Sequence, residues 1–432
     1  MTCDNHTVEA QTNPGATATG ARGATRRLLD HARSPWFWFE SICFFLIATH
    51  FEFGQTGSGF AYAIKLACLV VLFLPRFAIS TATVGSAIAW IAILAGLFLL
   101  VNVVESTDRA IIAFALVVVG SSVGLLRDRA WEQRFVAILT GYLVFHLGGF
   151  AFQIGQFLLD GRIVELHGLI FPSASRAYAV GNAARLSGFH IEPGTYTQWM
   201  LMVTFLRCLL VRRIASPLSG AVVVSTLTTL SLWALIGVAL FAAAATIEAV
   251  LQSTVWQKVR VAYLILFFGA AVVVLLYALP ESTIRDAMMY LDIKSDLTSQ
   301  SGVDKLVALA AILDKIPDVL IIGAPMSSTF CDACLSPQDL GVWASLIYYF
   351  GLLPAAVIVG LVSWSVMTKL GVSYVPLLAG LLLWKAQFYD PLLWIIVGGA
   401  LRLEPIVLVQ KAQQHWAART TNLQSINSRG SN

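Results

Sequence analysis

The sequence predicts an all-α, polytopic integral membrane protein with about twelve transmembrane helices, on the basis of its composition and its long apolar runs. Of its 432 residues, 58% are hydrophobic and only 12% are charged, and the mean hydropathy is +0.77. A soluble protein carries roughly 25% charged residues. The apolar runs recur along the chain and are long enough to cross a hydrocarbon core of about 30 Å. A membrane-spanning β-barrel would instead show short alternating strands.

We expect spans at residues 36–53, 59–75, 78–104, 109–126, 134–159, 194–211, 216–232, 233–251, 260–280, 340–361, 372–389 and 391–409. The stretch 216–251 is long for a single helix. Arg212 and Arg213 precede this stretch, and Lys258 and Arg260 follow it. Because basic residues concentrate on the cytoplasmic side of a membrane, both ends of the stretch are expected inside, and the stretch is predicted to be a helical hairpin.

With this hairpin the basic clusters alternate correctly along the chain, so that both termini are cytoplasmic. Residues 1–35 and 410–432 are then cytoplasmic tails, and residues 36–409 form a single membrane domain. The first tail is small, polar and poorly periodic, and we expect it to be flexible. Two sizeable loops face the outside, at about 160–193 and about 281–339.

The segment RLSGFHIEPGTYTQ, which begins at Arg185, brings several polar residues to the external edge of the sixth span. Arg185 offers a planar fork of N–H donors that suits phosphate oxygens. Glu192 precedes Pro193, a residue favoured at the first helical position, so its carboxylate is expected at a helix N-terminus. Gly188 permits close backbone approach, and His190 can exchange a proton near neutral pH. The residues alone leave two interpretations open: a substrate site, or a salt bridge between Arg185 and Glu192 that pins the loop to the helix.

This segment resembles the R-x-S-G-x-x-x-E-P motif of O-antigen and exopolysaccharide polymerases of the Wzy type, and it looks most similar to the exopolysaccharide branch. Further along, SGVDKLVALAAILDKIPDVLIIGAP is similar to the second external loop of that family, and SPQDLGVWASLIYYFGLLPAA resembles its Asp-containing entry to the tenth span. The similarity covers roughly residues 185–360 and the overall hydropathy. The motif positions are held by Arg185, Ser187, Gly188, Glu192, Pro193, Ser301, Lys305, Pro317, Gly323, Asp339 and Gly351.

The resemblance implies a GT-C-like architecture in the inner (cytoplasmic) membrane of a bacterium, and an inverting glycosyl transfer on its periplasmic face. The donor would be a growing glycan chain on undecaprenyl pyrophosphate. The acceptor would be a sugar hydroxyl of a lipid-linked repeat unit. The expected partners are this lipid-linked oligosaccharide, the membrane lipid, and a flippase and a chain-length regulator of the same pathway, with no nucleic acid.

Such a reaction needs a base for the hydroxyl proton and cations for the departing pyrophosphate. Glu192 is the first candidate for the base, followed by Asp339 and His190. No cofactor, metal ion or nucleotide sugar is required, because the energy of the reaction lies in the lipid pyrophosphate. Arg185 is the first candidate for a pyrophosphate contact, and the residues expected to bind substrate are Arg185, Arg176, Lys305, Ser187 and Gly188.

Two other functions stay open. Glycan ligases of the same superfamily carry a histidine in the second external loop, where this chain has Pro337, Gln338 and Asp339. That difference favours a polymerase, although His167 and His190 in the first loop keep the ligase open. A transporter would show internal repeats and charged, broken spans near the middle of the membrane, whereas the charges here concentrate in the external loops.

Two helical faces have alternative interpretations. The helix that begins with Ser-x-x-Asp at Ser301 either lies at the membrane surface as a lid or, as we favour, packs on the helix bundle. Its apolar face is formed by Val303, Leu306, Val307, Ala310 and Leu313. A polar stripe on the fifth span either lines a groove for the lipid substrate or forms hydrogen bonds between helices. That stripe consists of His146, Gly149, Gln153, Gln156 and Asp160.

The remaining charged and sulfur-containing residues receive no catalytic role. Lys65 and Lys385 are expected to extend to the membrane interface or to pair internally, and Asp390 is close enough in sequence to pair with Lys385. Cys331 and Cys334 form a C-x-x-C that fits a disulfide in an oxidising compartment or two free thiols. A zinc site would need further Cys or His ligands, which the nearby loop sequence does not offer.

Overall fold

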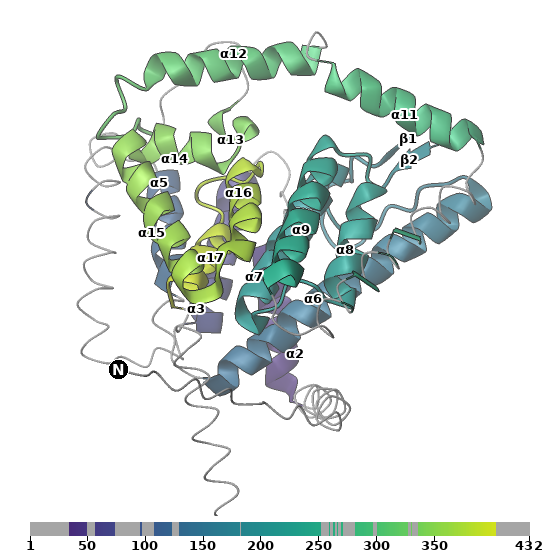
Figure 1. Cartoon of the computed structure of the whole chain (residues 1–432), viewed down its shortest axis with the longest axis horizontal. Helices are drawn as coiled ribbons and strands as arrows, with labels where there is room; N and C mark the ends of the chain where they lie inside the picture. The colour runs from purple at the N-terminus through teal and green to yellow at the C-terminus, as the bar shows by residue number, and fades with distance from the viewer. Residues whose placement is uncertain are drawn as a thin grey trace, which may run out of the picture.

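In the part of the chain that it describes, the computed structural model of the protein contains fourteen α-helices, one short 3-10 helix and one antiparallel hairpin of two strands (Figure 1). The structure describes residues 34–49, 57–73, 108–122, 129–181, 183–251, 281–296, 300–326 and 336–402, together with a few single positions between these ranges. The predicted all-α class is confirmed for these residues, with the small hairpin as an addition.

The first half of the described chain forms seven helices and the hairpin. The helices are α2 (Pro35–Ala48), α3 (Gly57–Phe73), α5 (Asp108–Ser121), α6 (Arg129–Asp160), α7 (Pro193–Val211), α8 (Pro217–Leu227) and α9 (Leu232–Leu251). The hairpin lies between α6 and α7, with strands β1 (Tyr178–Val180) and β2 (Ala183–Arg185).

The second half forms seven further helices and the 3-10 helix. These are α11 (Glu281–Ser295), α12 (Gln300–Lys315), α13 (Pro337–Leu340), α14 (Val342–Phe350), α15 (Leu352–Leu370), η4 (Val372–Tyr374), α16 (Val375–Leu383) and α17 (Pro391–Arg402). The expected helix after Ser301 is present as α12, whereas α11 has no counterpart among the expected elements.

Among the described residues, three helices are long and apolar enough to cross a membrane, which makes the chain a candidate multi-pass membrane protein. They cover Trp131–Asp160 of α6, Leu232–Leu251 and Leu352–Leu370. Shorter apolar helices cover Pro35–Ala48, Phe60–Phe73, Ala110–Ser121, Pro217–Leu227, Val372–Leu383 and Pro391–Arg402. The predicted spans 78–104 and 260–280 lie almost wholly outside the described residues. The total of twelve spans and the orientation of the chain stay predictions.

The stretch 216–251 is divided into two helices, as expected. Helix α8 ends at Leu227, and α9 begins at Leu232. Leu230, in the turn between them, has a φ of 52°, which a residue with a branched side chain rarely adopts. The two helices also contact each other.

The predicted single span at 340–361 is wrong, because two glycines divide this segment into separate helices. Gly341 (φ 123°) separates α13 from α14, and Gly351 (φ 95°) separates α14 from α15. Glycine adopts these dihedral angles without the steric penalty that a Cβ would bring. At Gly351 a Cβ would also lie 2.7 Å from the carbonyl oxygen of Ile321, so the second loop packs directly against this break.

The predicted span at 372–389 is also wrong in its second half. Helix α16 ends at Leu383, and Trp384 adopts an extended conformation with φ −67° and ψ 143°. The Trp384 carbonyl oxygen accepts a hydrogen bond of 2.9 Å from the backbone N–H of Val342 instead of continuing the helix. Residues 385–390 are therefore irregular backbone until Pro391 begins α17.

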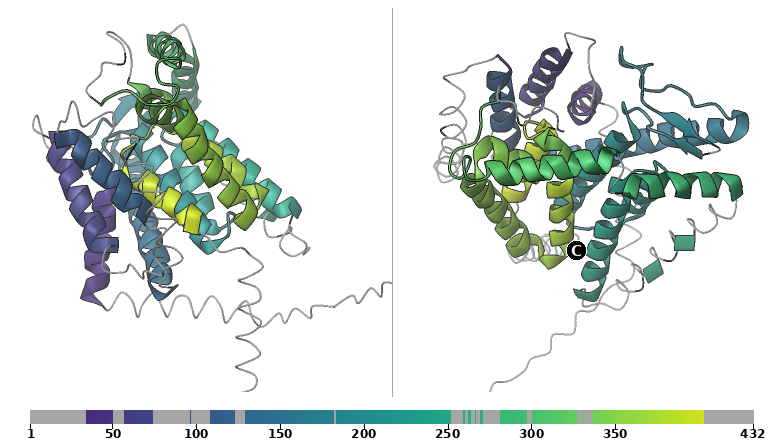
Figure 2. Two further views of the ribbon diagram at one scale, coloured as in Figure 1. Left: turned by 90° about the vertical axis from the view of Figure 1, so that its left-hand side faces the viewer. Right: turned by 90° about the horizontal axis from the view of Figure 1, so that it is seen from above.

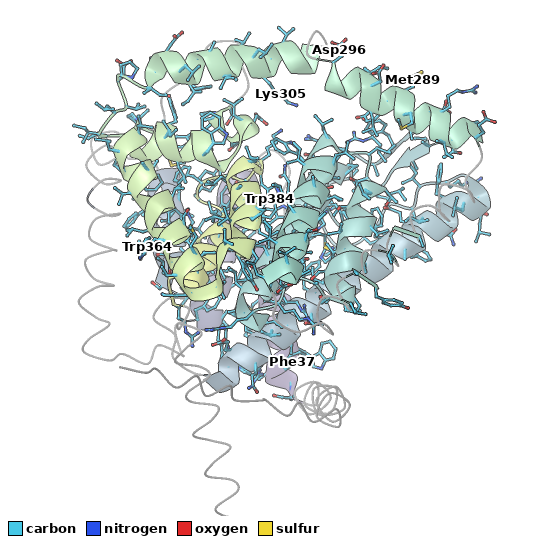
Figure 3. All side chains as sticks on the ribbon, in the orientation of Figure 1. Phe37, Met289, Asp296, Lys305, Trp364 and Trp384 are labelled. Atoms are coloured by element: carbon cyan, nitrogen blue, oxygen red, sulfur yellow. The ribbon has the colours of Figure 1, made fainter. Side chains whose placement is uncertain are left out.

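Helices α11 and α12 extend one after the other across one end of the molecule, over the helices that run lengthwise (Figures 1 and 2). Helix α12 packs on α13 and α14 through Ala308 and Ile312, which join a small cluster with Phe330 and Tyr348. The predicted apolar face points elsewhere, and its residues Val303, Leu306, Val307, Ala310 and Leu313 are exposed. Figure 3 shows Lys305 on this helix and Met289 on α11. The expected packing on the bundle thus occurs, but through a neighbouring face.

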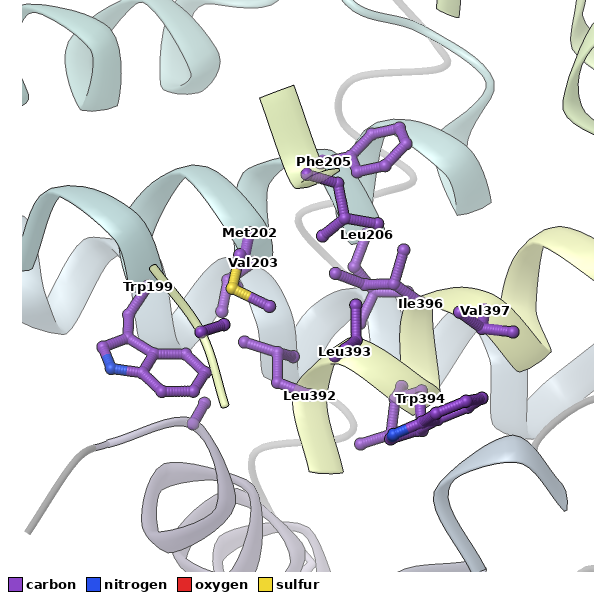
Figure 4. Packing of buried hydrophobic residues seen from close by; sticks show 14 of the residues in the cluster. Trp199, Met202, Val203, Phe205, Leu206, Leu392, Leu393, Trp394, Ile396 and Val397 are labelled. Atoms are coloured by element: carbon purple, nitrogen blue, oxygen red, sulfur yellow. The ribbon is translucent and has the colours of Figure 1, made fainter. Parts of the chain in front are cut away.

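Helices α7 and α17 form the centre of the main hydrophobic core (Figure 4). Trp199, Met202 and Leu206 of α7 lie near Leu392 and Ile396 of α17. Every residue from Pro391 to Ala400 is buried, as are most residues of α7. These two helices are therefore fixed by packing on all sides. The loop before α7 and the irregular segment before α17 each end at a rigid helix.

Candidate functional site

A cavity of about 390 Å³ opens where the loop before α7 and the end of the loop before α14 meet the helix bundle; we call it the polar cavity. Its wall combines α3, the first loop, the start of α7, α13 and the irregular segment before α17. The lining residues are Ala61, Tyr62, Lys65, Arg176, Glu192, Thr195, Gln198, Trp199, Gln338, Asp339, Lys385, Ala386, Gln387, Tyr389 and Asp390. Three of the residues predicted from the sequence, namely Arg176, Glu192 and Asp339, are among them.

Glu192 reaches the polar cavity because it is the N-cap residue of α7. It has extended dihedral angles, and Pro193 follows at the first helical position. Its side chain makes no capping hydrogen bond, so the carboxylate is not consumed by its own helix. The nearest cation is Arg176, whose Nη1 lies 3.8 Å from Glu192 Oε2. The backbone N–H of Arg176 donates to the carbonyl oxygen of Ile191, which holds the two charged residues side by side.

Asp339 reaches the same cavity from the second loop, in the short helix α13. Its carboxylate forms an ion pair with Lys385. Gln198 of α7 fixes the segment that carries Lys385. In the amide orientation that satisfies both its N–H and its oxygen, the Gln198 side chain donates to the Lys385 carbonyl oxygen (2.8 Å) and accepts from the Lys385 backbone N–H (3.3 Å). The expected pairing of Lys385 with Asp390 is therefore replaced by a pairing with Asp339.

Asp390 faces Lys65 instead, and both residues are buried. Asp390 precedes Pro391, and its Oδ1 accepts a hydrogen bond of 3.2 Å from the backbone N–H of Leu392 at the start of α17. The Lys65 ammonium lies 5.4 Å from the centre of the Trp199 ring, within the range of a cation–π contact. Helix α3 and the segment before α17 thus bring one more pair of opposite charges to the cavity.

Aromatic rings and amides complete the wall. The Tyr62 hydroxyl donates to Gln387 Oε1 and lies 3.4 Å from the Tyr389 hydroxyl, and the two tyrosine rings meet edge to face at 4.9 Å. Trp199 and Gln338 contribute a further ring and a further amide. Amides donate and accept hydrogen bonds, and ring faces pack on apolar ligand surfaces, so the wall offers the groups that a polyhydroxylated ligand requires.

Arg185, the first residue of the motif, does not line the polar cavity. It ends strand β2, and its guanidinium carbon lies 5.1 Å from the Tyr178 ring centre and 4.9 Å from the Tyr290 ring centre. Nη1 donates a 2.6 Å hydrogen bond to the Tyr178 hydroxyl, which itself lies 3.1 Å from the Tyr290 hydroxyl. We call Tyr178, Arg185 and Tyr290 the Arg185 clamp, because it joins the hairpin of the first loop to α11 of the second.

Ser187 and Gly188 also lie away from the cavity and fix the first loop to α6. Their backbone N–H groups donate to Gln153 Oε1 at 3.2 and 2.9 Å, and Gln153 Nε2 donates to the carbonyl oxygen of Val164. Gly188 has a φ of 56°, and a Cβ there would lie 3.3 Å from the Tyr196 ring. The polar stripe of α6 thus holds the loop at Gln153, whose hydrogen bonds join the helix to the loop and not to another helix.

His190 and Lys305 are likewise separate from the polar cavity. His190 is buried, with Nε2 3.4 Å from the Tyr142 hydroxyl and its ring 4.7 Å from the ring of His146. Lys305 lies on α12 (Figure 3) and does not line the cavity. Cys331 and Cys334 lie outside the described residues.

The turn that presents Arg176 is held by Glu165. This carboxylate accepts hydrogen bonds from the Gly168 N–H (3.0 Å), the Ser175 N–H (2.9 Å) and the Ser175 hydroxyl (2.5 Å). Burial alone would raise the pKa of the Glu165 carboxyl, but these hydrogen bonds together hold that pKa below its ordinary value. The loop is therefore preorganised next to the cavity.

A second cavity, between α14, α15, α16 and α17, is wholly apolar and measures about 20 Å³, roughly the space of one water molecule. Among the residues that the structure describes, no group of three or more His, Cys, Asp or Glu side chains could hold a metal ion.

The cavity residues that the sequence did not assign to the site include three charged residues, Lys65, Lys385 and Asp390. Lys65 carried a usable signal, because it lies within a predicted span and an ionisable residue there costs about 2.5–3.5 kcal/mol to insert and therefore usually has a function. Tyr62, Gln387 and Tyr389 carried none, since tyrosine and glutamine near membrane interfaces are common. Tyr62 meets Gln387 and Tyr389 because α3 packs against the segment before α17, which no local sequence pattern indicates.

Comparison of the chain with models of protein families, with curated proteins and with solved structures gives no match in any of the three.

Proposed function

We propose that the protein is a glycosyltransferase of the bacterial inner membrane that polymerises oligosaccharide repeat units linked to polyprenyl pyrophosphate. The observation that carries this proposal is the polar cavity, which unites Glu192, Arg176 and Asp339 from two separate loops. All three belong to segments for which the sequence resembles polysaccharide polymerases or to the loops beside them. A flippase that delivers repeat units and a chain-length regulator are the proposed partners.

The base of the proposed reaction is Glu192. A general base must accept a proton from the acceptor hydroxyl as the hydroxyl oxygen attacks the anomeric carbon. Glu192 suits this role because its carboxylate makes no capping hydrogen bond with a helix N–H and its ion pair with Arg176 is long, at 3.8 Å. Asp339 is less suited, because it is held in a close ion pair by Lys385.

The cations of the cavity serve the leaving group. As the bond between the anomeric carbon and the phosphate oxygen breaks, its electron pair stays on that oxygen and negative charge grows there. Arg176 and Lys385 both line the cavity and provide positive charge, one from the first loop and one from the segment before α17. Fixed cations can stabilise this charge in the way that a metal ion does in other phosphate sites.

The remaining wall suits the glycan. Sugar rings present hydroxyl groups around an edge and C–H groups on a face, and the cavity offers Gln198, Gln338 and Gln387 together with the rings of Tyr62 and Tyr389. The two histidines that kept a ligase open are less suited to the site. His167 is buried and lies 2.8 Å from the Phe189 carbonyl oxygen and 3.1 Å from the Ser173 hydroxyl, and His190 is buried next to Tyr142.

The proposal is tested by deleting the gene and analysing the lipid-linked glycans of the cell. Loss of a polymerase leaves single repeat units on the lipid carrier at the periplasmic face. Loss of a ligase leaves long chains on the carrier, and loss of a transporter leaves repeat units at the cytoplasmic face. Unchanged polymer length and amount in the deletion strain would refute the proposal.

A further inference from the structure

Three pairs of opposite charges line the polar cavity, and they differ in their access to water. The side chains of Arg176 and Glu192 are 69% and 36% exposed, and those of Lys385 and Asp339 are 41% and 14% exposed. Lys65 and Asp390 are 1% and 3% exposed. The charges thus form a series from the water-exposed rim to a dry interior.

A purely structural role does not account for the buried pair. Replacing a buried ion pair by apolar residues of similar volume is often neutral or stabilising, so packing of α3 against α17 does not require Lys65 and Asp390. Charged residues within spans are rare, and those that occur usually face a functional cavity. Lys65 belongs to α3, and both residues line the polar cavity.

The surroundings of Lys65 suit an anion with several charges. A charge in a low-dielectric interior acts on an incoming anion much more strongly than the same charge at a surface. The ammonium group offers three N–H donors as a compact point charge. The Lys65 ammonium lies 5.4 Å from the centre of the Trp199 ring, and the carboxylate of Asp390, which lines the same cavity, interacts electrostatically with it. Asp390 is fixed in turn by its hydrogen bond from the Leu392 N–H.

We infer that Lys65 is the principal cation for the diphosphate of the lipid-linked substrate, and that Asp390 is a positioning residue that keeps this ammonium charged and in place. The inference rests on the proposed function. In the transfer step the C–O bond to the acceptor forms, the bond from the anomeric carbon to the diphosphate breaks, and the hydroxyl proton goes to Glu192. The diphosphate leaves with the electron pair of the broken bond, and Lys65 faces the oxygen on which that charge appears.

The test uses the full-length protein in nanodiscs and measures the dissociation constants of farnesyl pyrophosphate and farnesol by calorimetry. Farnesyl pyrophosphate carries the diphosphate on a short isoprenoid, and farnesol carries the isoprenoid alone. We expect Lys65→Met to weaken binding of farnesyl pyrophosphate by at least about 30-fold, as for the loss of one partner from a buried charge contact. Binding of farnesol should not change, which shows that the protein is still folded.

Two further variants separate function from structure. Lys65→Met leaves Asp390 unpaired and can impair folding, so the double variant Lys65→Met with Asp390→Asn removes both charges together. We expect this variant to keep the thermal midpoint of the wild type and still to bind farnesyl pyrophosphate about 30-fold more weakly. Lys369→Met is the matched control, because this lysine donates to the Leu401 carbonyl oxygen away from the cavity, and it should bind as the wild type does.

Asp390→Asn alone should weaken binding of farnesyl pyrophosphate by about tenfold, because the remaining ammonium loses the charge that stabilises it. Wild-type affinity of the double variant would overturn the inference and leave the proposed function standing. A wild-type protein that binds farnesyl pyrophosphate no better than farnesol would overturn the proposed diphosphate substrate and the inference together.

Discussion

The polar cavity and the Arg185 clamp each contain one arginine of the first loop, but they place it in opposite surroundings. Arg176 is open to solvent and has a carboxylate at 3.8 Å. Arg185 has its guanidinium near two tyrosine rings and donates to a tyrosine hydroxyl. An arginine with open N–H groups can bind phosphate oxygens, whereas one between aromatic rings mainly links the elements that carry them. The comparison teaches that the partners of a side chain, more than its place in a motif, indicate its role.

The largest effect is expected from Glu192→Gln, which removes the base from the cavity and keeps the shape of the side chain. Without a group to accept the proton, the rate of polymer formation should fall by about 10²–10⁴-fold. Stability should not change, because Glu192 makes no capping hydrogen bond with its side chain. The rate is measured in membranes supplied with lipid-linked repeat units, and folding is checked by thermal melting.

Glu281→Gln is the control for this variant, since Glu281 is an exposed carboxylate at the start of α11 and should have no effect on the rate. A Glu192→Gln protein that polymerises at the wild-type rate would remove Glu192 from the chemistry and point to Asp339 as the base.

A smaller effect is expected from Arg176→Ala. Loss of one charged contact at the exposed rim should lower kcat/KM by about tenfold, chiefly through KM, and reduce the dependence of KM on salt. The melting temperature should stay unchanged, because the ion pair with Glu192 is exposed and long. Arg162→Ala changes another exposed arginine of the same loop and serves as the control. Equal effects of the two variants would show that only the net charge of the loop matters.

The smallest effect on activity is expected from Arg185→Ala, together with a clear structural one. Removing the guanidinium abolishes its contacts with both rings and its hydrogen bond, at a cost of about 1–2 kcal/mol of local stability. Backbone amide hydrogens of α11 should therefore exchange faster, while polymer formation falls by less than about threefold. Hydrogen exchange with mass spectrometry measures the first quantity, and the membrane assay measures the second.

Tyr290→Phe sharpens this comparison, because it keeps the ring beside Arg185 and loses only the contact between the two tyrosine hydroxyls. This variant should speed the exchange of backbone amide hydrogens in α11, but by less than Arg185→Ala does. Abolished polymer in Arg185→Ala with normal exchange in α11 would instead show that Arg185 contacts substrate, as the motif implies.

Local features of the sequence predicted much of the fold. The lengths of the apolar runs indicated helices, and the break near Leu230 and the start of α12 were found close to their expected places. The turn at Gly351 was expected from the family resemblance, whereas the break at Gly341 was missed, because a glycine within an apolar run does not reveal whether another segment packs against it. The same limit applied to residues 384–390, where hydrogen bonds to Val342 and Gln198 replace those of a helix.

The sequence by itself determined that this is an apolar, helical chain with charged loops, because run length and composition act within each segment. It also indicated that Glu192 lies at the start of a helix, since proline is favoured at the first helical position and Pro193 follows it. Only the tertiary structure decided which charges share one cavity. Tyr62 and Gln387, which are 325 residues apart, meet in its wall. Such contacts depend on how the helices pack against one another, and no pattern within a single segment contains that information.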